Sequence, residues 1–352
     1  MLYNFSSTAS RGILGTMHKR SVLSLLALAL AGVVHASGYS ITTIDTAGTD
    51  ATFVLDINNA GQWAGYALQI NPMLPGGGNY SALTGQADGT GIKTLTRTGA
   101  YGLGASGINS SGDISGVSVN MSFQAMGFTH HDDGSAEGVY TDVDPATGGL
   151  SSVYSEAVDL NDTGMVVGFY NETQPADQEE ASTTAHGFIR DGAGTYTAIN
   201  FPGAGNHGTQ LYSVNDAGVA SGRYLDASGL SHGFLYSSSL GYVDTSIPGF
   251  DSTENGGLNS LGDYTAVAYL DPLNPYAVVS FIYSGGTYTP FAVPGALTTV
   301  AYGMNDQGQI VGLYASPDLS LHGFVATPVP EPASLAALGI GMVALVRRRR
   351  KA

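Results

Sequence analysis

Cysteine is absent from this chain of 352 residues, and tryptophan occurs once, at Trp63. Without cysteine there is no disulfide, no thiol nucleophile and no thiolate metal ligand, so the fold depends on its buried apolar surface. Residues 37–328 also lack any helical pattern, and with it the strand-to-helix turns that carry a Gly-x-Ser-x-Gly nucleophile or a phosphate-binding loop. We therefore expect neither a thiol enzyme nor a nucleotide-binding fold.

Basic residues are scarce in most of the chain. The sequence has 12 Lys and Arg against 28 Asp and Glu, and most of the basic residues lie at the two ends. Residues 37–328 keep 4 basic and 27 acidic side chains, a formal charge of −23. Nucleic acids and anionic membrane surfaces bind clustered Lys and Arg, so neither is expected as a partner. The charge favours a soluble exported surface.

The N-terminal segment, 1–36, is predicted to be a signal peptide. A basic region at 18–20 precedes an apolar run over 22–34, and small residues occupy the −3 and −1 positions before a bond that follows Ala36. The apolar run predicts a signal helix that is cleaved after Ala36, and Met17 is an alternative start. A permanent membrane span is the other reading, but 13 apolar residues are few for one.

The C-terminal segment, 329–352, is predicted to be a second targeting signal. Pro330, Glu331 and Pro332 precede an apolar run over 335–346, and a cluster of Arg and Lys fills 347–351. A helix over the apolar run would be roughly 18 Å long, short of the ~30 Å hydrocarbon core, so it suits transient insertion better than anchoring. A simple C-terminal membrane tail is the alternative.

The order of these three elements resembles the PEP-CTERM sorting signal of Gram-negative bacteria. The resemblance implies export to the cell surface or the extracellular space, recognition by an exosortase-type processing enzyme, and removal of the tail near Pro330, Glu331 and Pro332. The membrane contact that it implies is transient and runs through the C-terminal helix.

Between the two targeting segments, over 37–328, the sequence repeats itself. A phrase of the form apolar-Asn-polar-x-Gly occurs six times, at 57–61, 108–112, 160–164, 214–218, 258–262 and 304–308. The six asparagines are 51, 52, 54, 44 and 46 residues apart. Asn at the first position and Gly at the fourth are typical of a hairpin turn in which the glycine adopts a positive φ. Each phrase therefore predicts a tight turn between two strands.

Two further strands follow each turn, which gives four strands in about 50 residues, the size of a β-propeller blade. The third strands include His-Gly-Phe at 186–188, 232–234 and 322–324. The last unit ends after its third strand, whereas the mature N-terminus opens with an orphan fourth strand over 39–44. We therefore predict an all-β, six-bladed β-propeller that is closed by N-terminal strand exchange, with an open β-solenoid as the alternative.

The His-Gly-Phe strands also resemble the extracellular HAF-type repeat, with Gly in place of Ala. That resemblance implies export and names no activity.

Candidate chemical groups are few. His186, His232 and His322 head equivalent strands, so they either surround a metal or make the same structural hydrogen bond in each blade. The segment 130–133, His-His-Asp-Asp, is expected to be a solvated turn. We expect no cofactor. The alternative is a calcium site, formed by the carboxylates of Asp142 and Asp144 or by those within 177–180. The metal ligands and any catalytic residues stay unassigned.

Loops on one face of a propeller are its usual binding positions, and the longest polar excursions are 68–80 and 171–185. Trp63 and the tyrosines are candidates to stack on sugars, or else to pack between blades. We expect an exported surface or matrix protein with a structural or binding role, in contact with exopolysaccharide or a biofilm. A secreted glycan hydrolase or lyase is the alternative, and ionisable residues that converge on one mouth of the central channel would favour it.

Overall fold

The computed structural model describes residues 38–71, 73, 78–173, 175, 184–204, 208–271 and 277–329. The signal helix, Ala36 and the sorting residues Pro330, Glu331 and Pro332 lie outside these ranges. The described residues form strands and one short 3₁₀ helix, Pro145–Gly148. Within these ranges, no helix is long and apolar enough to cross a bilayer. The described chain is therefore all-β, as predicted.

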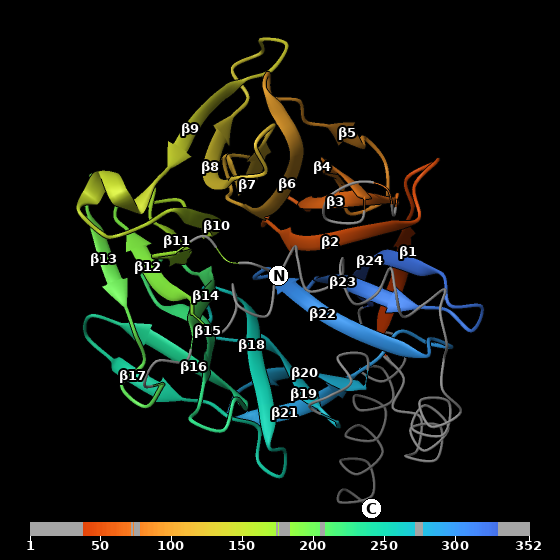
Figure 1. The fold of residues 1–352 in the computed structure, drawn as a ribbon. Coiled ribbons are helices and arrows are strands. Elements are labelled where there is room, and N and C mark those ends of the chain that lie inside the picture. The colour runs from red at the N-terminus through yellow and green to blue at the C-terminus, as the bar shows by residue number, and fades with distance from the viewer. Residues whose placement is uncertain are drawn as a thin grey trace, which may run out of the picture.

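The strands form four-stranded antiparallel units, here called blades, which surround a common axis (Figure 1). Blade 1 contains β2 (Ala51–Ile57), β3 (Gln62–Ile70), β4 (Gly78–Gln86) and β5 (Lys93–Thr94). Blade 2 contains β6 (Ala100–Ile108), β7 (Ile114–Asn120), β8 (Ala125–His131) and β9 (Val139–Val143). Blade 3 contains β10 (Tyr154–Leu160), β11 (Val166–Asn171), β12 (His186–Arg190) and β13 (Tyr196–Ile199).

The other three blades repeat this order. Blade 4 contains β14 (Thr209–Val214), β15 (Ala220–Leu225), β16 (Ser231–Ser237) and β17 (Gly241–Asp244). Blade 5 contains β18 (Ser252–Leu258), β19 (Tyr264–Tyr269), β20 (Val278–Ser284) and β21 (Thr287–Phe291). Blade 6 contains β22 (Thr298–Met304), β23 (Ile310–Ala315), β24 (Leu321–Pro328) and β1 (Tyr39–Ile44).

The N-terminal strand completes the last blade. β1 pairs antiparallel with β24 over its whole length, from Tyr39 opposite Pro328 to Ile44 opposite Gly323. Blades 6 and 1 form one eight-stranded sheet, but their junction is a single parallel pair between Ala51 and Leu321. The predicted exchange of a strand between the two ends is therefore present, and it covers an edge that β24 would otherwise expose.

The repeated phrase forms the predicted turn between the first and second strands of each blade. In blade 3, the N–H of Gly164 donates to the carbonyl of Asn161 at 3.2 Å, and Gly164 has a φ of +79°. The equivalent first glycine of each phrase also has a positive φ, a conformation that a residue with a side chain adopts at a cost. The turn chemistry read from the sequence is confirmed.

A second glycine of the phrase lies against a β-bulge in the first strand. The register of β10 with β11 shifts between Ala157 and Asp159, opposite Gly168. A Cβ at Gly168 would collide with the backbone carbonyl of Glu156, so a side chain would push the two strands apart. Blade 5 has Ala266 at this position, and its bulge is longer, between Asn255 and Leu258.

The buried core lies between neighbouring blades. The third strands carry Phe128, Phe188, Phe234 and Phe324, all 0% exposed. A Cβ on the preceding Gly127 would lie 2.7 Å from the backbone nitrogen of Ala157 in the next blade. In the His-Gly-Phe strands, a Cβ on Gly233 would collide with Asn255 of the next blade, and one on Gly323 would lie 2.8 Å from Val54 of the next blade, so close packing between blades favours glycine there too. The innermost strands, such as β10, are buried along their whole length, whereas outer strands such as β17 are half exposed.

The fourth strands are shorter than predicted. The sequence predicts strands over 196–201, 242–247 and 288–293, but β13, β17 and β21 end at Ile199, Asp244 and Phe291. Each of these segments is followed by a Pro-Gly pair, at 202–203, 248–249 and 294–295. The residues before each pair leave the sheet because the chain turns there toward the next blade. Phe201, for example, donates its N–H to the hydroxyl of Thr209 at 3.1 Å.

Candidate functional site

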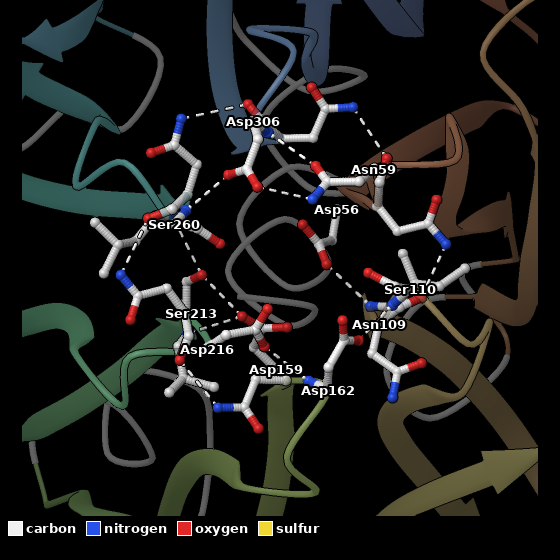
Figure 2. A pocket seen from close by; sticks show the side chains of 18 of the residues that line it. Asp56, Asn59, Asn109, Ser110, Asp159, Asp162, Ser213, Asp216, Ser260 and Asp306 are labelled. Atoms are coloured by element: carbon white, nitrogen blue, oxygen red, sulfur yellow. Dashed lines mark hydrogen bonds between the residues drawn. The ribbon is translucent and has the colours of Figure 1, made fainter.

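The six repeated turns meet at one end of the axis and surround a small cavity (Figure 2). In each repeat, the asparagine, the residue before it and the residue after it line the cavity, and in blades 1, 3 and 4 the residue two before the asparagine also lines it. We call this set of residues the axial ring. Each position recurs around the axis because each blade contributes one turn.

The asparagines link one blade to the next. In each of the six turns, the side-chain oxygen accepts at least one N–H of its own turn; Asn161 accepts from Thr163 and Met165, both at 3.0 Å. Its amide nitrogen then donates to the carbonyl of Asn215 in the next blade at 2.9 Å. The same link joins Asn58 to Asn109, Asn215 to Asn259, Asn259 to Asn305 and Asn305 to Asn58. The last link runs from blade 6 back to blade 1.

Blade 2 is the exception in this series. The amide nitrogen of Asn109 donates to Asp113 of its own turn at 3.4 Å instead of crossing to blade 3. Its side-chain oxygen still accepts from Ser111 and Asp113, at 3.1 and 2.9 Å. Asn109 therefore shapes its turn as the others do, but its amide nitrogen binds within the turn and not to the neighbouring blade.

The residue after each asparagine adds a second circle of bonds at the rim. The N–H of Asp162 donates to the carboxylate of Asp216 at 2.9 Å, and the N–H of Ser260 donates to Asp306 at 2.8 Å. Asp306 in turn donates its N–H to Asn59 at 2.9 Å. Asp216 is exposed and Asp306 is half-buried, and each of the three contacts joins two blades. The rim is thus held by side chains that accept from the backbone of a neighbour.

The position two before the asparagine differs among blades: Asp56, Gly107, Asp159, Ser213, Gly257 and Gly303. The carboxylate of Asp56 accepts the N–H of Ile108 at 2.9 Å. That of Asp159 accepts the N–H of Val214 and the hydroxyl of Ser213, both at 2.8 Å. These two aspartates are also contacts between blades, and they lie deepest in the cavity.

Burial governs the electrostatics of these two carboxylates. Desolvation raises the pKa of Asp56 to about 6, although its hydrogen bonds from the backbone of Ile108 and Ile57 oppose the shift. Desolvation also raises the pKa of Asp159 well above its usual range, and the nearby charge of Asp56 adds to it. A proton on one of the pair is therefore favoured at mildly acidic pH.

The space at the axis is small. The cavity inside the axial ring has a volume of about 70 Å³, and a second cavity below it, reached by Asp56 and Asp159, has about 30 Å³. Tyr212 and Tyr302 line that second cavity and belong to the apolar cluster that fills the axis. A cavity of this size holds a few water molecules, not a sugar ring.

Two larger cavities lie at the other ends of the strands. The blade 2 groove, of about 370 Å³, lies between blade 2 and Val153 of blade 3; it is lined by Arg97, Asn120, Gln124 and Asp142 among others. The blade 6 groove, of about 290 Å³, lies between Leu321 of blade 6 and Ala51 of blade 1. Ala100 and Ala51, which begin β6 and β2, line the grooves, whereas those strands end at the axial ring. Both grooves are near the lower size of small-ligand sites.

The three predicted histidines do not meet. The Nδ1 atoms of His186, His232 and His322 pair with Asn200, Ser246 and Asp45, at 3.0, 3.1 and 2.9 Å. Each imidazole also stacks on a tyrosine of its own blade, namely Tyr170, Tyr224 and Tyr314. The reading of a repeated structural hydrogen bond is confirmed. In the ranges that the structure describes, no three potential metal ligands come together.

The other predicted groups are separate as well. His131 is exposed and pairs with Asp113 at 2.6 Å, but His130 is 4% exposed, so the prediction of a solvated turn is wrong for His130 because its ring packs on Tyr140. Asp142 pairs with Arg97 at 2.6 Å, and Asp144 caps the 3₁₀ helix. The segment 177–180 lies outside the described residues.

Trp63 is not available to a ligand. It is 0% exposed, and its indole N–H donates to the carbonyl of Gln86 at 2.9 Å. The long polar excursions over 68–80 and 171–185 lie partly outside the described residues.

Sequence reasoning missed the axial aspartates and both grooves. Asp56 and Asp159 were detectable, since they are the only carboxylates two residues before a repeat asparagine. The grooves carried no such signal because their residues come from separate loops of two blades.

Comparison with known proteins adds the sorting signal and the fold. The PEP-CTERM protein-sorting motif matches residues 328–351, which implies an exported protein that an exosortase recognises. No curated protein matches the chain. The resemblance to HAF-type repeats stays a prediction.

Solved structures share the architecture at low identity. AofleA from Arthrobotrys oligospora is similar with a TM-score of 0.52 and 9% identity, over 82% of this chain and 85% of that one. A Trypanosoma rangeli sialidase in complex with the inhibitor DANA is similar with a TM-score of 0.51 and 10% identity, over 89% of this chain and 62% of that one. The Aleuria aurantia lectin, a six-bladed β-propeller, gives a TM-score of 0.45 and 14% identity, over 84% of this chain and 97% of that one. At these identities the likenesses to AofleA and to the sialidase concern the fold alone.

Proposed function

We propose that this chain is an exported six-bladed propeller, closed through β1, that binds a glycan at or outside the cell surface. Exopolysaccharide is the candidate ligand. The sorting motif supports export, and the acidic surface argues against nucleic acid and anionic membranes as partners. Membrane contact is proposed to be transient and to run through the C-terminal segment.

One observation carries the binding role. The polar side chains of the axial ring are engaged with neighbouring blades around a cavity of about 70 Å³, whereas two grooves of about 370 and 290 Å³ lie at the opposite ends of the strands. The ring therefore supports a structural role for the repeat, and the grooves supply the volume that a sugar unit needs.

A glycan array with the purified full-length chain tests this function. We expect retention on at least one class of bacterial exopolysaccharide or its oligosaccharides, and displacement by the free sugar. Absence of binding to every glycan, with intact folding shown by circular dichroism, would overturn the proposal.

A secreted glycan hydrolase or lyase is the second candidate. The observation in its favour is the pair Asp56 and Asp159, two buried carboxylates with raised pKa at one mouth of the channel. Release of reducing ends or unsaturated products from a polysaccharide, lost in both Asp56→Asn and Asp159→Asn, would favour this candidate. Unchanged polysaccharide after prolonged incubation would exclude it for that substrate.

A further inference from the structure

The turn between the second and third strands has the same geometry in blades 2, 4 and 6. In blade 4, Asp226 accepts the N–H groups of Ser228 and Leu230, and Gly229 has a φ of +79°. In blade 2, Asn120 accepts the N–H groups of Ser122 and Gln124 in the same way. The residue equivalent to Gly229 is Phe123, with a φ of +61°. In blade 6 it is Leu319, with a φ of +71°.

A bulky side chain at such a φ is strained, and the turn itself does not require one, because glycine occupies the position in blade 4. Such strain is concentrated at functional sites. Phe123 and Leu319 are the two positive-φ residues other than glycine among the described residues. Each lies beside one of the two large grooves: Asn120 and Gln124 line the blade 2 groove, and Ser320 lines the blade 6 groove.

The phenyl ring of Phe123 is both exposed and held in place. It is 45% exposed, and it packs edge-on against Tyr101 with ring centroids 4.8 Å apart. Met121, 71% exposed, precedes it in the same turn, and Val153, 47% exposed, lines the groove from blade 3. A fixed aromatic face beside further apolar surface suits the C–H face of a sugar ring.

The groove next to the phenyl ring of Phe123 offers both hydrogen-bond donors and hydrogen-bond acceptors. Arg97 lies with its guanidinium carbon 5.1 Å from the ring centre of Tyr140, and one of its nitrogens binds Asp142 at 2.6 Å. That pair uses one nitrogen of a group with five N–H donors, and Asp142 is 56% exposed and can accept. The amide oxygen of Gln124 is held by Asn120 at 3.2 Å, which leaves its amide nitrogen as a further donor to the groove.

The charge of the site favours a neutral ligand. Arg97 and Asp142 compensate each other within the groove, and residues 37–328 carry a formal charge of −23, which repels a polyanion. Sugar hydroxyls both donate and accept, so a neutral hexose unit can bind the arginine and the aspartate together.

We propose that the blade 2 groove is a neutral-glycan site, with Phe123 as its stacking platform and with Arg97 and Asp142 as its polar contacts. This proposal rests on the proposed glycan-binding function and names the surface and the ligand class for it.

Titration calorimetry with the full-length chain tests the site. The probes are cellotetraose, maltotetraose and mannotetraose, with tetragalacturonate as the acidic arm. We expect a neutral tetrasaccharide to bind and tetragalacturonate not to bind. Phe123→Gly should weaken that binding about tenfold while it leaves the fold intact, because glycine fits the positive φ. Arg97→Gln should also weaken it.

Leu319→Gly is the matched control, since it makes the same backbone change at the blade 6 groove. We expect it to keep the wild-type affinity. If the chain binds a neutral glycan and Phe123→Gly binds it equally well, the groove is wrong and glycan binding stands. Equal losses in both glycine variants, or a preference for tetragalacturonate, would also overturn the site. No binding of any tetrasaccharide, together with a negative glycan array, removes the site and the function together.

Discussion

The axial ring and the blade 2 groove are both polar, but they use different kinds of position in the repeat. The ring is made of residues that recur in each blade, such as Asn161 and Asn215, and their polar atoms bind the neighbouring blade. Beside the groove lies a residue that departs from the repeat, namely Phe123 where blade 4 has Gly229. In this chain, the recurring asparagines make contacts between blades, and the proposed ligand site lies where an exposed position departs from the repeat.

The largest expected effect comes from removing β1. Deletion of residues 37–46 removes the pairing of Tyr39–Ile44 with β24 and exposes the edge of the last blade. We expect gross destabilisation or aggregation, which would abolish the ring and the groove together. Thermal unfolding monitored by circular dichroism and light scattering provides the measurement. Unfolding that matches the intact chain would contradict closure through β1.

The second effect separates two functions of the repeat asparagine. Asn161→Ala removes four hydrogen bonds of a side chain that is 4% exposed, and should lower the free energy of unfolding by about 2–3 kcal/mol. Asn109→Ala is the control, because Asn109 shapes its turn without the bond to the next blade. It should cost about 1 kcal/mol less. Urea unfolding of both variants gives the comparison.

An equal loss in the two variants would mean that the bond between blades adds nothing beyond the turn. In that case the ring would be a set of separate turns, and its contrast with the groove would weaken.

The third effect concerns pH. Burial raises the pKa of Asp56 from an ordinary value of 3.8 to about 6, so the folded state binds this proton more tightly than the unfolded chain. The stabilisation is therefore present below about pH 4 and is lost as the pH rises through 6. Asp56→Asn should remove this contribution to the pH dependence of the free energy of unfolding. It should raise that free energy by about 1–2 kcal/mol at pH 7.5, with little change at pH 4. Parallel profiles of the free energy of unfolding against pH for the wild-type chain and Asp56→Asn would contradict this role of Asp56.

Much of the fold could be predicted from the sequence because its determinants are local and repeated. The phrase around Asn161 and Gly164 encodes a turn through chemistry that needs no tertiary information. The orphan strand at 39–44 was detectable because its pattern matches other fourth strands, and its partner β24 was missing one neighbour. The strand ends differ from the prediction: β17 ends at Asp244 and not at 247, since the following residues leave the sheet to reach the next blade.

The candidate sites were harder to predict for a physical reason. The blade 2 groove combines Arg97, Gln124, Asp142 and Val153, which come from four separate segments of two blades. No spacing in the sequence encodes that convergence. Likewise, the burial of Asp159 depends on close contact with Gly107 of blade 2, where a Cβ would lie 2.5 Å from its carboxylate oxygen. Such proximity follows from the packing of neighbouring blades around the axis, not from either segment alone.

The smallest expected effect is also the sharpest test of the contrast between repeated and divergent positions. If Phe123 is held at a φ of +61° for a ligand and not for the turn, then Phe123→Gly should raise the free energy of unfolding by about 0.5–1 kcal/mol, because glycine adopts that conformation freely. The lost packing on Tyr101 opposes the gain, so Tm should rise slightly or stay constant. Gly229→Ala, which places a side chain at the equivalent φ of +79°, should lower stability by about 1 kcal/mol. A loss above about 2 kcal/mol in Phe123→Gly would instead make the phenyl ring part of the core and remove the argument from strain. Calorimetric melting of the three proteins at one pH decides between these outcomes.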